Sequence, residues 1–109
     1  MNLNSIIKII CFYILSVLLF LKIENDEYRF IGASLLYLFG LFFFKINLKF
    51  GLLFIFIALV TTVTEHIYIK YIKNTWTYKT PQIGKVPYWL LPLWGHGIII
   101  ISEIIKLLN

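Results

Sequence analysis

Long apolar runs separated by short polar stretches dominate this chain of 109 residues. Four runs can be drawn, at about residues 6–22, 30–44, 50–71 and 87–108. The last two reach the roughly 20 residues that a helix needs to cross a bilayer core of about 30 Å, and the first two are somewhat short of that length. Backbone groups inside a bilayer must bond within their own segment, which favours helices. The pattern predicts an all-α fold, an integral membrane bundle of four transmembrane helices that forms a single domain over residues 1–109.

The polar stretches between the runs predict how the helices follow one another. Residues 22–29 carry three acidic and two basic side chains, a composition typical of water or lipid headgroups. Residues 45–49 form a short turn, so the helices on either side of it should be antiparallel neighbours. Residues 72–86 make the longest connection. Pro87 fits the first turn of the last helix, and Pro92 is expected to kink that helix.

Composition supports a membrane location. Hydrophobic residues make up 61% of the chain and charged residues 14%, whereas soluble domains have about 45–50% and about 25%. The net charge of +5 comes from lysines at the ends of the apolar runs, where lipid headgroups would meet them. We therefore expect a multi-pass membrane protein whose partner is the lipid bilayer, and no binding of nucleic acid. Six basic residues fall on the side of the 22–29 and 72–86 connections and four on the side of the termini, which favours a location of both termini outside the cytoplasm.

Glu65 is the most informative single residue. It lies late in the third run, and an intramembrane carboxylate usually faces a protein interior or a water-filled cavity. Thr61 and Tyr68 share its helix face at spacings of four and three residues. One interpretation is a polar pocket in which Glu65 acts as an acid, a base or a cation ligand. The other is that the helix ends near Thr64, so that Glu65 and His66 are ordinary interfacial residues.

The second histidine, His96, is predicted near the membrane midplane in the fourth run. If the fourth helix returns along the third, His96 and Trp94 could reach the face of Glu65. A glutamate–histidine pair between helices could transfer protons or bind a metal. The chain has two histidines and neither an HxxxH nor an HExxH motif, so we expect no metal site and no cofactor. The serines have no base nearby in sequence, which gives nucleophilic catalysis no support.

Part of the chain resembles a known family of membrane domains. In order, it has a carboxylate late in a helix, an aromatic pair, a glycine and a proline-led helix: Glu65, Trp76, Tyr78, Gly84 and Leu91-Pro92-Leu93-Trp94. This order resembles small integral membrane domains of the lycopene cyclase and carotenoid hydratase type. The resemblance implies a few helices and proton-driven chemistry on isoprenoid chains. Where those domains carry paired glutamates, this chain has Trp94 and Gly95.

Two functions from different classes lead, and a transporter or ion pathway comes third because four short helices would need to oligomerise to enclose a path. In the first, a polar, aromatic-rimmed pocket between the third and fourth helices binds or modifies a lipid-like, isoprenoid molecule. Glu65 would then exchange the proton, with His66 and His96 in support. The ligand would contact the remaining candidate residues, Thr61, Tyr68, Trp76, Tyr78, Trp89 and Trp94. In the second, the chain is a non-enzymatic accessory, assembly or permeability subunit that acts as a homo-oligomer or with a membrane protein partner.

Overall fold

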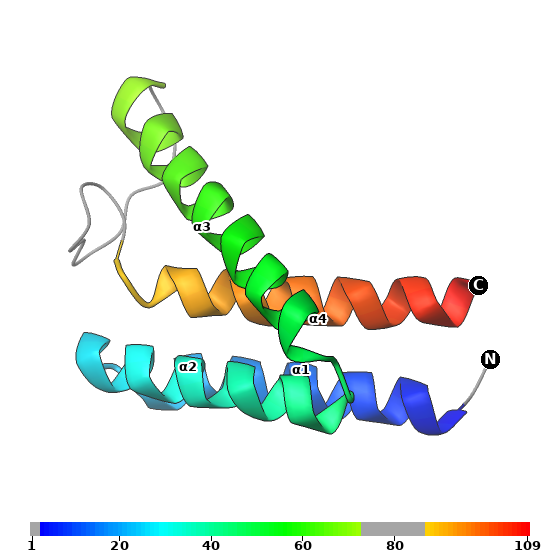
Figure 1. Cartoon of the computed structure of the whole chain (residues 1–109). Coiled ribbons are helices and arrows are strands. Elements are labelled where there is room, and N and C mark those ends of the chain that lie inside the picture. Colours follow the sequence, from blue (N-terminus) through cyan, green and yellow to red (C-terminus); the bar gives the residue numbers. More distant parts are fainter. Residues whose placement is uncertain (1–2, 73–86) are drawn as a thin grey trace.

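The computed structural model describes residues 3–72 and 87–109. Within these ranges the chain forms four α-helices and no strand (Figure 1). They are α1 (Leu3–Lys22), α2 (Asp26–Phe43), α3 (Leu48–Tyr71) and α4 (Leu90–Leu108). The described part is therefore all-α, as predicted.

Asparagine caps start two of the helices. The side chain of Asn25 accepts a hydrogen bond from the backbone N–H of Tyr28, and Asn47 does the same for Phe50. Such caps satisfy backbone donors that the first turn leaves unpaired. Because Asn25 is the cap, α2 begins at Asp26 rather than at residue 30 as predicted. Its acidic first turn also suits the positive end of the helix dipole.

The start of α4 differs from the prediction. The helix begins at Leu90, so Pro87 precedes it instead of occupying its first turn. Pro92 consequently lies in that first turn, where a missing N–H breaks no helical hydrogen bond. The predicted kink is absent: α4 runs straight in Figure 1.

Helix α4 is central to the arrangement, because it packs against each of the other three helices. Figure 1 shows α1, α2 and α4 running alongside one another, while α3 crosses α4 and diverges from the group. Both termini lie at the same end as the turn between α2 and α3. A core between α1, α2 and α4 is built from buried apolar side chains: Ile9, Phe12, Tyr37, Leu41, Phe44 and Ile99.

Close backbone approach at glycine makes this packing tight. A Cβ atom added at Gly95 of α4 would lie 2.6 Å from the Tyr37 ring of α2. That ring is held in place, because the Tyr37 hydroxyl donates a 2.6 Å hydrogen bond to the backbone carbonyl of Gly51 in α3. Tyr37 therefore joins α2 to both α4 and α3.

The outer surface is strongly apolar. Helices α1, α3 and α4 are long and apolar enough to cross a membrane. Their outward-facing side chains include large aliphatic and aromatic groups, such as Leu52, Phe56 and Ile101. Helix α2 is 18 residues long and carries acidic side chains in its first turn. The fold is thus a helical bundle with three helices suited to a bilayer, and a lipid environment would accommodate its exposed apolar surface.

Candidate functional site

His96 lies at the junction of three helices. Its side chain is 1% exposed. Nδ1 is 2.7 Å from the Ser16 hydroxyl of α1, and Nε2 is 2.7 Å from the backbone carbonyl of Ala33 in α2. A carbonyl can only accept, so Nε2 carries a hydrogen and donates to it, and in the neutral ring Nδ1 accepts the hydrogen bond from Ser16. Both nitrogens of His96 are therefore bonded.

Packing around the imidazole holds its orientation. Ala33 is fully buried, so its small side chain lets α2 approach α4 closely. The Phe12 ring of α1 meets the imidazole edge to face, with 5.6 Å between the ring centroids. Contacts from three helices thus fix the orientation of His96. The same contacts hold α1, α2 and α4 together and place the hydrogen-bonded pair of Ser16 and His96 inside the bundle.

Glu65 accepts a hydrogen bond from a tryptophan of α4. The Trp94 indole N–H of α4 donates a 2.7 Å hydrogen bond to Glu65 Oε2 of α3, on the exposed side of the contact. The sequence suggested that both Trp94 and His96 could reach Glu65. Trp94 does so, whereas the nitrogens of His96 bond to Ser16 and Ala33.

A groove of about 460 Å³ brings these groups together. Most of its lining comes from α1 and α4, and α3 contributes Glu65. The residues that line it are Tyr13, Ser16, Val17, Phe20, Leu21, Glu65, Leu90, Leu93, Trp94, His96, Gly97 and Ile100. We call it the α1–α4 groove. The sequence placed a pocket between the third and fourth helices, but this groove lies mainly between the first and fourth.

Three further candidates, all on α3, lie outside the groove lining. Thr61 donates its hydroxyl hydrogen bond to the carbonyl of Ile57 in its own helix. Tyr68 is 47% exposed, and His66 is half-buried on the same helix. Trp76 and Tyr78 fall outside the residues that the structure describes.

Trp89 belongs to a separate cluster where α1, α2 and α4 meet. Its indole N–H donates to Asp26 at 2.9 Å, and the Arg29 guanidinium lies 5.0 Å from its ring. Arg29 also donates hydrogen bonds to the backbone carbonyls of Phe20 and Ile23, at 2.9 and 2.8 Å. These carbonyls end α1, so the cluster caps that helix and anchors the start of α4.

Sequence reasoning missed Ser16. Its partner, His96, is 80 residues away along the chain, and an isolated serine in an apolar run gives no signal of that pairing. In the described ranges, residues 3–72 and 87–109, no three acidic, histidine or cysteine side chains come together to hold a metal ion.

Comparison with known proteins gives no match to the chain among protein-family models, curated proteins or solved structures. The resemblance to cyclase-type domains therefore stays a prediction. The geometry of the groove has to support any function by itself.

Proposed function

We propose that the chain is a multi-pass membrane protein that binds a lipid-like molecule, of the isoprenoid class, in the α1–α4 groove. The observation that carries this proposal is the composition of the groove. Its walls are mainly aliphatic and aromatic, and among the described residues of its lining Glu65 is the only one with a charged side chain. Such a surface fits a long apolar chain that ends in one polar group.

The Glu65 carboxylate defines the polar end of the ligand. A carboxylate accepts hydrogen bonds, so it favours a head that donates one, such as the hydroxyl of an isoprenoid alcohol. In this proposal Glu65 accepts the hydrogen bond and is the group placed to exchange a proton. The hydrogen bonds of His96 to Ser16 and Ala33 fix the positions of the helices that form the groove. In the proposal, the Trp94 ring, which donates to Glu65, contacts the apolar chain of the ligand.

Four membrane crossings belong to the same proposal. Helix α2 packs alongside α1 and α4 and, once its first turn is passed, is apolar (Figure 1). Its 18 residues span about 27 Å at 1.5 Å per residue. Four crossings agree with the termini lying at one end. In a Cys11→Ser background, single cysteines at Glu24 and Lys49 should react with impermeant thiol reagents from opposite sides. Reaction from one side only would overturn the four-crossing arrangement.

Ligand binding can be tested by filling the groove. Gly97 lines it, and a Cβ atom added there would meet nothing within 4 Å. Gly97→Phe should therefore occupy the groove without disturbing the helix packing. The protein is reconstituted in nanodiscs and photolabelled with an isoprenoid alcohol that bears a diazirine. Labelled peptides should come from residues 13–21 and 90–100 in the parent chain, and labelling should fall at least fivefold in Gly97→Phe.

The matched control is Ile101→Phe, which adds a ring at a position that is 58% exposed and outside the groove lining. It should label like the parent. Equal labelling of the parent and Gly97→Phe would overturn the proposed binding site.

The second candidate, an accessory or assembly subunit, is favoured by the position of α3. This helix diverges from the others and exposes much of its apolar surface, including Phe56 at 62% (Figure 1). Another membrane helix could cover that surface. Such a subunit would form a defined oligomer in cross-linking, would tolerate Glu65→Gln and would show no groove labelling.

A further inference from the structure

A second groove lies at the end of the molecule that carries both termini, and its lining is basic. Its volume is about 490 Å³. Its charged side chains are Lys8 of α1, Lys45 of the α2–α3 turn, and Glu103 and Lys106 of α4. Three cationic groups and one carboxylate leave an excess of positive charge. We call it the lysine groove.

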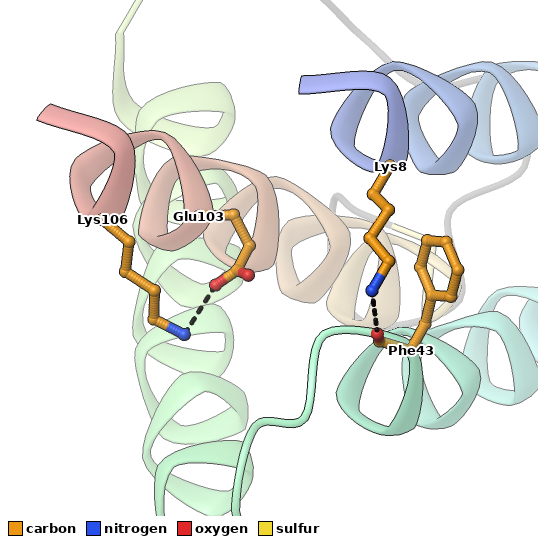
Figure 2. Close-up of polar contacts among 4 residues, drawn as sticks. All are labelled: Lys8, Phe43, Glu103 and Lys106. Carbon is orange, nitrogen blue, oxygen red and sulfur yellow. Dashed lines mark hydrogen bonds and ion pairs between the residues drawn. The ribbon is translucent and has the colours of Figure 1, made fainter. Parts of the chain in front are cut away.

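Glu103, the acidic side chain among the described lining residues, is already paired. Glu103 lies 2.8 Å from the Lys106 ammonium, and its side chain is 12% exposed (Figure 2). Lys8 turns toward α2 instead, where its ammonium lies 3.5 Å from the Phe43 carbonyl and 5.0 Å from the centre of the Phe43 ring. The carbonyl and ring leave the charge of Lys8 uncompensated, so it still attracts anions.

Lys45 has an unusual backbone conformation that brings a third ammonium to this groove. Its φ angle is 55°, in the left-handed region that favours glycine. The backbone N–H groups of Lys45 and Ile46 bond to the carbonyls of Phe42 and Leu41, the pattern of a Schellman motif that closes α2. Glycine is the usual residue at this position. A lysine held in this conformation is a backbone outlier of the kind from which a functional role for the side chain can be hypothesised.

The groove also has apolar walls, formed by Ile9, Phe44 and Leu107. It is built from the first turns of α1, the last turns of α4 and the turn after α2, which all lie at one end of the bundle (Figure 1). In the membrane arrangement of the proposed function, this end meets the headgroup layer. Basic pockets between transmembrane helices at this depth suit anionic headgroups.

We propose that the lysine groove binds the phosphate headgroup of an anionic phospholipid, with Lys8, Lys45 and Lys106 facing the phosphate and the apolar walls contacting the acyl chains. This inference rests on the membrane placement in the proposed function, but it concerns a different groove and a different ligand. It makes the lipid a bound partner at a defined site and not only a solvent.

The test measures binding of fluorescent phosphatidylglycerol to the full chain in nanodiscs of phosphatidylcholine. Lys45→Gln removes one charge from the groove and should weaken binding about fivefold. This factor corresponds to the binding free energy that one lysine contributes near an anionic headgroup layer. Lys49→Gln is the matched control, because it removes the same charge four residues away, outside the groove lining. It should change the affinity less than twofold.

Lys45→Gly separates binding from folding. Glycine relieves the left-handed strain, so thermal unfolding in detergent should occur at the same or a higher temperature while the affinity for phosphatidylglycerol falls. If Lys45→Gln and Lys49→Gln lowered the affinity for phosphatidylglycerol equally, the loss would come from general surface charge, and the proposed site would be overturned. Equally tight binding of fluorescent phosphatidylcholine would also overturn the site. Displacement of the lipid by millimolar inorganic phosphate would overturn it as well, because the groove would then be a site for free phosphate.

The two grooves can be tested independently. Gly97→Phe should lower labelling by the isoprenoid probe at least fivefold and leave phosphatidylglycerol binding unchanged. Lys45→Gln should weaken phosphatidylglycerol binding about fivefold and leave the labelling unchanged. Loss of both kinds of binding in either variant would contradict the assignment of two separate sites.

Discussion

Ser16 of α1 donates its hydroxyl hydrogen bond to Nδ1 of His96 in α4 across 2.7 Å, although the two residues are 80 positions apart. The other imidazole nitrogen bonds to the carbonyl of Ala33 in α2. The buried imidazole of His96 therefore connects α4, the last helix, to both α1 and α2 by hydrogen bonds. In the bilayer location proposed above, water could not replace a lost partner, and such a bond would specify which helices are neighbours.

Removing the serine hydroxyl should destabilise the bundle. Ser16→Ala leaves Nδ1 of His96 buried without its donor, which should lower the free energy of unfolding by about 1–2 kcal/mol. The measurement is unfolding by sodium dodecyl sulfate in mixed micelles, followed by circular dichroism. Ser102→Ala, which removes a half-buried hydroxyl from α4, is the control and should change stability by less than about 0.5 kcal/mol. Equal stability of Ser16→Ala and the parent would contradict the assigned bond.

The helices could be predicted from sequence because hydropathy alone marks long apolar runs. Their starts could not be predicted as well, for local reasons. The charged residues before Phe30 look like a loop, yet Asn25 caps them into the first turn of α2. Pro87 and Pro92 both suit a first turn, and α4 begins at Leu90, so that Pro92 occupies it.

The candidate site shows the same limit at longer range. Glu65 and Trp94 could be brought together from sequence, because one is late in the third helix and the other early in the fourth. The partner of His96 depends on how α1 packs on α4. That packing comes from apolar shape, including the fit of Phe12 against the imidazole, and it leaves no polar pattern in the sequence.

Arg29 should contribute to stability through its geometry as well as its charge. It donates to two backbone carbonyls at the end of α1 and lies over the rings of Phe20 and Trp89. Arg29→Ala should lower the free energy of unfolding by about 2 kcal/mol, the scale for hydrogen bonds to charged groups. Arg29→Lys should recover only part of it, because lysine lacks the planar fork. The control is Lys22→Ala, which removes an exposed charge nearby. Full recovery by lysine would show that charge alone matters.

Two neighbouring positions on α4 should respond oppositely to the same substitution. Gly95→Ala places a Cβ atom 2.6 Å from the Tyr37 ring, which is held by its own hydrogen bond, so about 1–3 kcal/mol should be lost to overpacking. Gly97→Ala meets nothing within 4 Å and should be neutral or gain up to about 1 kcal/mol from helix propensity. Thermal unfolding in detergent measures both. Similar losses at the two positions would contradict the packing of α4 on α2.

The hydrogen bond between Glu65 and Trp94 should contribute little to stability. It lies on the exposed side of the contact between α3 and α4, where solvent or headgroups can replace it. A double-mutant cycle with Glu65→Ala and Trp94→Phe should give a coupling energy of about 0.5–1 kcal/mol. The chain should therefore accumulate in folded form without the carboxylate. If Glu65 serves a ligand, Glu65→Ala should nevertheless reduce photolabelling by the isoprenoid alcohol several-fold. A coupling above about 2 kcal/mol, or a failure of Glu65→Ala to accumulate, would instead make Glu65 a tie between helices and favour the accessory subunit.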